Sequence, residues 1–123
     1  MKPWKLVFGV PFYGYEWTNV PNIDDGLFEP GSPLGQGSAY NFIVTIESQF
    51  QKRRDSITYE PWLYDGTNFW TYGDPVTIKF KMGYFRRRHL ASVMVWELSN
   101  DVYDGRLLNT IASSLKRKDE DDE

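Results

Sequence analysis

The chain has no cysteine and a single histidine, His89, among its 123 residues. The absence of cysteine excludes disulfides, thiolate metal sites and a cysteine nucleophile. One histidine excludes a two-histidine metal site and argues against a Ser-His-Asp triad. The sequence also lacks Gly-x-Gly-x-x-Gly and Gly-x-x-x-x-Gly-Lys phosphate loops. We therefore predict no metal site and no cofactor.

Long hydrophobic runs and a strong excess of one charge are absent too. No apolar run approaches the roughly 20 residues that a membrane span requires, and the net charge is −3. The one basic cluster, Arg86–His89, falls at the end of a predicted helix, where cations suit the helix dipole. We predict neither a membrane nor a nucleic-acid partner. The N-terminal segment does not have the pattern of a signal peptide, and the localisation stays open.

Aromatic residues are abundant: they make up 17% of the chain, with 5 Trp, 8 Tyr and 8 Phe. Aromatic side chains fill hydrophobic cores, and their faces also stack on the apolar faces of sugar rings. Composition alone leaves both roles open.

Two short apolar runs frame the chain. Lys5–Val10 and Ser92–Glu97 are continuous and rich in β-branched residues, which predicts strands of a parallel sheet covered on both faces. Before the second run, Asp74 and Pro75 form a helix start, with Asp at the N-cap and Pro at the first helical position. The helix is predicted over Pro75–Arg88.

The segment between these elements contains three predicted features. Phe12–Gly37 is rich in glycine and proline and is predicted to be a long loop, which in a compact domain is usually functional. Ala39–Gln51 has apolar residues four apart and predicts a helix that Ser38 caps. Two aromatic runs joined at Asp65-Gly66 predict a hairpin.

A last helix is predicted from an Asp104 N-cap through about Lys116. Residues 116–123 are a mixed-charge run that predicts a disordered, solvated tail. Four side chains of this helix are predicted to face the core: Leu107, Leu108, Ile111 and Leu115.

Carboxylates are the remaining candidates for catalysis. Asp24, Asp25 and Glu29 lie close together in the sequence, and Glu97 and Asp101 follow the second apolar run. None stands in an apolar setting that would raise its pKa for acid catalysis, although Glu97 comes closest. We favour a structural role for Glu97, in which it bonds a neighbouring loop.

Four segments in register resemble the C-terminal part of the family 18 glycoside hydrolases, the chitinase family. KLVFGVPFYGYEW, from residue 5, resembles the seventh barrel strand and its loop. YEPWLYDGTNFWTYGDP, from residue 59, resembles the hairpin of the chitinase insertion domain and the helix start after it. SVMVWELSND, from residue 92, resembles the eighth strand, and DGRLLNTI, from residue 104, resembles the closing helix.

This resemblance implies an α/β fold: the C-terminal fragment of a (β/α)₈ TIM barrel with an inserted α+β lobe. Residues 1–17 would be the seventh strand and its loop, and residues 18–74 the insertion lobe. Residues 75–115 would supply a helix, the eighth strand and the closing helix, and residues 116–123 the tail.

The resemblance also implies a sugar site at the C-terminal ends of the two strands. Trp96 would be the apolar floor under the sugar in the −1 subsite, and Tyr13 would line the same subsite. Trp17 and Glu97 are the other expected substrate-binding residues. The partner would be chitin or a chitooligosaccharide.

The chain departs from the family where the chemistry lies. It contains no D-x-x-D-x-D-x-E, the signature that carries the catalytic acid, and no Met-x-Tyr-Asp. The Arg that often follows Tyr-Gly is Tyr15, and Gly-Gly before the last strand is Ala91-Ser92. We therefore expect no catalytic residue here and no activity from the chain alone.

Three roles stay open from the sequence. The chain is expected to be part of a chitinase-like hydrolase, associating with a missing N-terminal catalytic half. Alternatively, it is a non-catalytic carbohydrate-binding module. A third role is an assembly unit that self-associates through open sheet edges.

Overall fold

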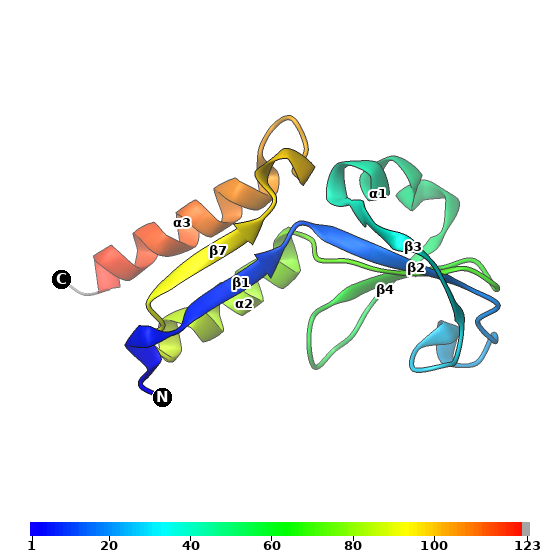
Figure 1. Cartoon of the computed structure of the whole chain (residues 1–123), viewed down its shortest axis with the longest axis horizontal. Helices are drawn as coiled ribbons and strands as arrows, with labels where there is room; N and C mark the ends of the chain where they lie inside the picture. Colours follow the sequence, from blue (N-terminus) through cyan, green and yellow to red (C-terminus); the bar gives the residue numbers. More distant parts are fainter. Residues whose placement is uncertain (122–123) are drawn as a thin grey trace.

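The computed structural model describes residues 1–121, with side-chain surroundings up to residue 116. A two-stranded parallel sheet with two helices lies beside a five-stranded antiparallel sheet with one helix (Figure 1). The predicted mixed α/β class is therefore correct. Within the described residues, no helix is long and apolar enough to cross a membrane.

The small sheet pairs β1 (Val7–Pro11) with β7 (Ser92–Trp96), and Pro11 lies opposite Trp96. The two predicted strands and their parallel direction are thus confirmed. The predicted start of the first strand is corrected, because residues 3–5 form a 3₁₀ turn.

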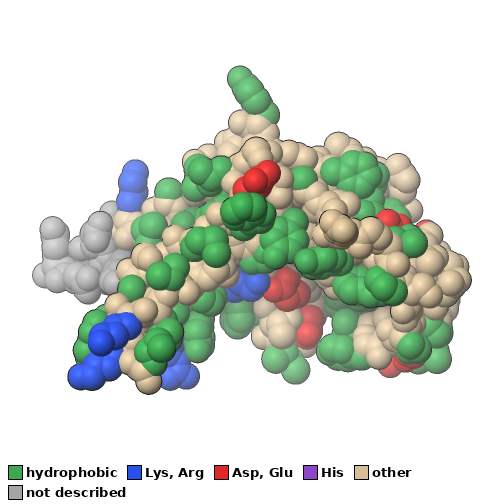
Figure 2. Space-filling view, in the orientation of Figure 1, with side chains coloured by type: hydrophobic (Ala, Val, Ile, Leu, Met, Phe, Trp, Pro, Cys, Tyr) green, Lys and Arg blue, Asp and Glu red, His purple; other side chains and the backbone are tan. Residues whose placement is uncertain are grey.

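The two faces of this sheet differ. Phe8 and Val95 pack against the core beneath α2 (Pro75–Arg87) and α3 (Arg106–Asp121). On the other face, Val7 is 59% exposed and Met94 50% exposed. The prediction of strands covered on both faces is wrong, since nothing in the described chain packs on this second face. Figure 2 shows apolar side chains along this part of the surface.

The large sheet has the strand order β3-β2-β6-β5-β4. All four neighbouring pairs of strands run antiparallel. Its strands are β2 (Tyr13–Thr18), β3 (Ser32–Ala39), β4 (Gln51–Arg54), β5 (Pro61–Tyr64) and β6 (Phe69–Thr71).

The prediction of one long loop over Phe12–Gly37 is wrong, because this segment holds two strands. β2 is an interior strand that pairs with both β3 and β6, so its backbone hydrogen bonds go to strands distant in sequence. β3 is an edge strand, where Pro33 is tolerated because its missing N–H need not face a partner. The expected boundary between strand loop and lobe, at residue 18, falls at the end of β2.

The predicted hairpin is confirmed: β5 and β6 pair, and Asp65 accepts hydrogen bonds from the backbone N–H groups of Thr67 and Asn68. The predicted helix after β3 is shorter than expected. It consists of α1 (Tyr40–Ile46) and a 3₁₀ turn at Glu47–Gln49, and then β4 follows. Ser38 does not cap α1, because Ser38 lies in β3 opposite Gly14.

The C-terminal helix is capped by two aspartates. Asp104 accepts from the N–H of Arg106, as predicted. Asp101 accepts from the N–H groups of Leu107 and Leu108. Leu107 and Ile111 are buried, whereas Leu108 and Leu115 are exposed, so only half of the predicted apolar face is correct. The tail expected from Lys116 begins inside α3, and residues 122–123 lie outside the described part.

A buried carboxylate joins the two parts of the fold. Asp74 is 3% exposed and caps α2, as predicted, by accepting from Thr77 N at 3.1 Å. Lys52 Nζ lies 3.0 Å from Asp74 Oδ2, and Arg54 Nη1 lies 3.0 Å from Oδ1. Burial opposes the charge, but the bonds from Arg54, Thr77 and Lys52 outweigh it and hold the pKa of Asp74 well below its ordinary value.

Asp74→Ala should therefore lower the free energy of unfolding by about 2–4 kcal/mol, because it removes the cap and the buried carboxylate that Arg54 and Lys52 share. A carboxylate with a lowered folded-state pKa stabilises the fold above its unfolded pKa of about 4. The difference between parent and variant should shrink as the pH falls below that value. Urea unfolding at pH 7 and at pH 3 measures both effects.

Asp25→Ala is the matched control, because it breaks an exposed ion pair with another cation of β4: Arg53 Nε lies 3.1 Å from Asp25 Oδ2. Its expected cost is about 1 kcal/mol or less. Equal losses for the two variants would contradict the role assigned to Asp74.

Candidate functional site

A pocket of about 440 Å³ lies where β1 and β7 end. Trp96, the last residue of β7, is 63% exposed at this pocket, and its carbonyl accepts from Phe12 N at 2.8 Å. Tyr13 begins β2 just beyond that bond and lines the same pocket. The structure thus brings together the two residues that the sequence singled out. We call this hollow the Trp96 pocket, and its full lining is Tyr13, Tyr15, Gln36, Gly37, Ser38, Ala39, Trp96 and Asn100.

Alternate residues of β2 form an aromatic row, which we define as Tyr13, Tyr15 and Trp17. The ring centroids of Tyr13 and Tyr15 lie 5.7 Å apart in an edge-to-face arrangement, and those of Tyr15 and Trp17 lie 6.1 Å apart. The residues share one face because side chains alternate along a strand. Trp17 lies at the far end of the row and does not line the Trp96 pocket.

Gly14 makes the row possible. A Cβ atom at this position would lie 2.1 Å from the carbonyl oxygen of Thr71 and 2.8 Å from Ile43 Cδ1. Any side chain here would push β2 away from β6 and from α1. Only glycine allows the backbone between Tyr13 and Tyr15 to approach this closely.

Glu97 is exposed and lies outside the lining of the Trp96 pocket. Its Oε1 accepts from Ser99 Oγ at 2.7 Å, which is the loop-bonding role favoured from the sequence. The peptide bond between Trp96 and Glu97 is cis.

The loop after β7 is fixed by α1. Asn41 Nδ2 donates to the carbonyl of Ser99 at 3.0 Å and to that of Asp101 at 3.2 Å. Asp101 itself is engaged with backbone N–H groups at the start of α3, including Leu107 N at 3.2 Å. Asp101 is therefore a structural carboxylate.

The remaining sequence candidates lie elsewhere. Asp24 and Asp25 are in a 3₁₀ turn, and Glu29 follows it; none of the three lines the Trp96 pocket. In the described part of the chain, no group of three or more Asp, Glu or His side chains could hold a metal ion.

Sequence reasoning missed part of the pocket. Tyr15 was noted only as a departure from the family, although its alternation with Tyr13 could have revealed a shared face. The sequence predicts Gln36 and Gly37 in a loop, and Ser38 and Ala39 at a helix start. All four line the pocket instead, because β3 pairs with β2. No local signal marks that pairing.

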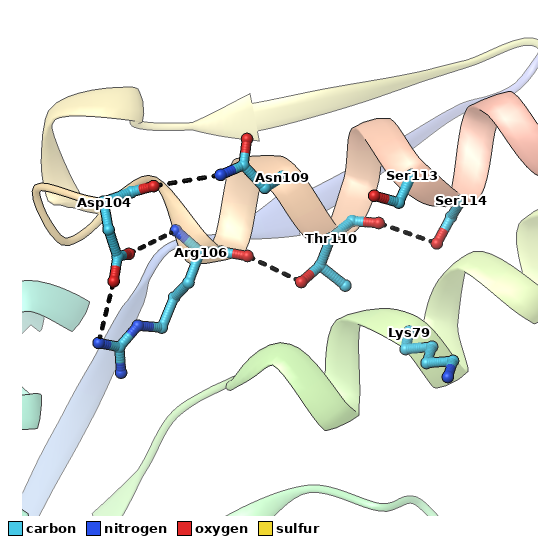
Figure 3. Close-up of a pocket in the computed structure, with 7 residues that line it drawn as sticks. All are labelled: Lys79, Asp104, Arg106, Asn109, Thr110, Ser113 and Ser114. Carbon is cyan, nitrogen blue, oxygen red and sulfur yellow. Dashed lines mark hydrogen bonds and ion pairs between the residues drawn. The ribbon is translucent and has the colours of Figure 1, made fainter.

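A second hollow, of about 450 Å³, lies between α2 and α3 (Figure 3). Two of its polar side chains bond to the backbone of α3: Thr110 Oγ1 donates to the carbonyl of Arg106, and Ser114 Oγ donates to that of Thr110. The Arg106 guanidinium pairs with Asp104. We assign this hollow to helix packing.

Comparison with known proteins identifies the family. The sequence model described as Glycosyl hydrolases family 18 matches residues 1–101. Chitinase 63 of Streptomyces plicatus is 31% identical over 112 residues, which cover 91% of this chain and 18% of that protein. A solved family 18 N-acetylglucosaminidase from Paenibacillus barengoltzii is 32% identical, with a TM-score of 0.83 over 93% of this chain and 34% of that one.

A class V chitinase from Nicotiana tobaccum is 27% identical, with a TM-score of 0.80 over 91% of this chain and 34% of that chain. The chain therefore belongs to glycoside hydrolase family 18, as the resemblance implied. It spans about a fifth of the length of Chitinase 63 and a third of these solved chains.

Replacement of Gly14 by Ala should lower the free energy of unfolding by about 2 kcal/mol or more, because the added methyl group overlaps the backbone of β6. The near-ultraviolet circular dichroism should change as well, since Tyr13 and Tyr15 flank the site. Gly73→Ala is the control, because a Cβ there meets nothing within 4 Å. If both variants unfold at the same urea concentration, the close approach at Gly14 is not what holds β2 in place.

Proposed function

We propose that the chain supplies one wall of a chitooligosaccharide site in a chitinase-like hydrolase. In this proposal β1, α2, β7 and α3 correspond to the last part of a (β/α)₈ barrel. The five-stranded sheet and α1 correspond to the chitinase insertion lobe. The solved chains that the fold matches include a Nicotiana tobaccum class V chitinase described as a complex with NAG4, and this supports a chitin oligomer as the ligand.

The meeting of Trp96 and Tyr13 in one pocket carries the proposal. The indole of Trp96 offers an apolar face on which the axial C–H face of a pyranose can stack. Ser38 and Asn100 supply polar groups at the rim that can bond sugar hydroxyls. In (β/α)₈ barrels, active sites are built at the C-terminal ends of the strands, where this pocket lies.

Hydrolysis requires an acid that this chain does not carry. In family 18 the substrate's own acetamido oxygen acts as the nucleophile, so one protein acid suffices. The D-x-x-D-x-D-x-E signature of that acid is absent from the 123 residues. We propose that the chain binds sugar and that cleavage depends on association with a polypeptide bearing the acid.

Titration of the chain with N-acetylated chitotetraose, followed by calorimetry, should show binding that Trp96→Ala weakens about tenfold. The reason is the loss of the stacking face. Trp4→Ala is the matched control, because Trp4 is 60% exposed and Trp96 is 63% exposed. Trp4 precedes β1, at the opposite end of the small sheet.

The same samples should release no product from the oligosaccharide. Turnover by the parent chain that disappears in Trp96→Ala would mean that this chain carries a catalytic acid, which contradicts the proposal. Equal binding by the two tryptophan variants would remove the Trp96 pocket as the site.

The exposed face of the small sheet favours a second candidate, an assembly unit. β1 and β7 pair only with each other in the described chain, and Val7 and Met94 leave apolar surface in water. Open edges and apolar faces of this kind recruit other strands.

Sedimentation of the chain at tens of micromolar concentration should therefore show self-association. Met94→Lys should shift the chain toward monomer, because a buried lysine without a partner is costly. The control is Ile57→Lys, an exposed apolar residue outside both sheets. A monomeric parent would contradict this candidate and leave the sugar-binding proposal intact.

A further inference from the structure

The Trp96 pocket has two walls that come from different parts of the fold. β2 and β3 of the large sheet supply six of its eight lining residues, and the other two are Trp96 and Asn100. Asn100 ends a 3₁₀ turn that follows β7. A ligand that touches both walls binds well only if the walls are held at a fixed spacing. The contacts that fix this turn therefore decide the shape of the pocket.

The turn that carries Asn100 has little apolar anchoring of its own. Its first residue, Leu98, is 58% exposed, and Glu97 and Ser99 are exposed too. Two backbone bonds close it: Asn100 N donates to Glu97 O at 3.0 Å, and Asp101 N donates to Leu98 O at 3.2 Å. A single 3₁₀ turn is not stable by itself. The position of Asn100 therefore depends on contacts with neighbouring elements.

One of these contacts comes from the side of the large sheet. Asn41, the second residue of α1, donates from Nδ2 to the carbonyl of Ser99 at 3.0 Å and to that of Asp101 at 3.2 Å. The two carbonyls belong to the residues on either side of Asn100, and the amide group has one hydrogen for each. Figure 1 shows α1 next to the loop that follows β7. Asn41 thus restrains the backbone around Asn100, although it does not line the pocket itself.

Asn41 is held in place by the residues around it. The preceding residue, Tyr40, is 2% exposed, and its N–H donates to the carbonyl of Phe12 at 3.0 Å. Ile43, in the same turn of α1, is buried in the core cluster that contains Phe12. Because the first turn of α1 is fixed to the core, Asn41 sets the position of the exposed turn, and not the reverse.

The side chain of Asn100 is available to a ligand. It is half-buried and lines the pocket, and its carboxamide makes no hydrogen bond to any other described residue. A carboxamide can both donate and accept, as can the hydroxyl and acetamido groups of a sugar. Asn100 can therefore bond the polar edge of a ring whose apolar face stacks on Trp96.

We propose that Asn41 is a positioning residue of the sugar site: it holds the Asn100 carboxamide at the rim of the Trp96 pocket, where Asn100 hydrogen-bonds the sugar. This inference rests on the proposed binding of a chitooligosaccharide. It adds that a residue of α1 outside the pocket sets the affinity and acts through Asn100. Because the turn is in place before the sugar arrives, little loss of loop freedom opposes binding.

A double-mutant cycle on the affinity for N-acetylated chitotetraose, measured by calorimetry, tests the proposal. Asn41→Asp keeps the size of the side chain and removes both donors, and a carboxylate in the first turn of α1 suits the helix dipole. Asn41→Asp and Asn100→Ala should each weaken binding about three- to tenfold, the effect of one lost hydrogen bond. The double variant should bind no more weakly than Asn100→Ala, because the two residues act as one unit.

Asn109→Asp is the matched control for the first variant. Asn109 Nδ2 also donates to a backbone carbonyl, that of Asp104 at 3.1 Å, and Asn109 lies outside the lining of the Trp96 pocket. The control variant should bind the tetraose as tightly as the parent.

Hydrogen exchange of the ligand-free chain, followed residue by residue by NMR, tests the positioning step without sugar. In Asn41→Asp, the N–H groups of Asn100 and Asp101 should exchange about tenfold faster than in the parent, because the turn that protects them is no longer held. Asn109→Asp should leave both rates unchanged.

Unchanged exchange rates in Asn41→Asp would overturn the proposal. In a chain whose binding depends on Trp96, parent-like affinity of Asn41→Asp would overturn it too, as would losses that multiply in the double variant. If the parent does not bind the tetraose at all, the sugar site itself is contradicted, and with it the role of Asn100. Faster exchange in Asn41→Asp would then still support the hold of Asn41 on the turn.

Discussion

The position of the large sheet depends on the charge of Asp74. This carboxylate lies at the start of α2. The two cations that pair with it, Lys52 and Arg54, lie in β4, an edge strand of the five-stranded sheet. A buried carboxylate must stay paired, so the sheet cannot rotate against α2 without a large loss of free energy. Tyr72 strengthens the same junction, since its hydroxyl donates to Glu47; burial first and this carboxylate second raise its pKa, so it stays protonated.

The alternation of side chains from β1 into β2 explains how the Trp96 pocket forms. Val10 and Phe12 turn into the core, so their neighbours Pro11 and Tyr13 turn to the opposite side. The backbone of Phe12 is hydrogen-bonded where the chain passes from the small sheet to the large one. Its N–H donates to the carbonyl of Trp96, and its carbonyl accepts from the N–H of Tyr40. Trp96 and Tyr13 therefore meet as a consequence of how β1 continues into β2.

The sequence predicts those features whose causes are local. The Asp74 cap and the turn at Asp65 depend on residues within a few positions, and the structure contains both. β2, β3 and β4 escaped prediction because each depends on partners distant in sequence: β2 and β3 carry the glycine and proline of a loop, and β4 is a basic edge strand. For the same reason the sequence predicts only two of the eight lining residues, Trp96 and Tyr13, and misses Gln36–Ala39.

The proposed sugar binding and the proposed assembly use one surface, so we expect them to be linked. Met94 precedes Trp96 by two residues on the same face of β7, and Pro11 lies opposite Trp96. A strand that covers Met94 must therefore end beside the sugar pocket. If its last residues add polar groups around Trp96, sugar binding and assembly strengthen each other by the same factor; if they fill the pocket, each weakens the other equally. Mutual strengthening is expected if the pocket is one wall of an active site, and mutual weakening if the surface serves only assembly.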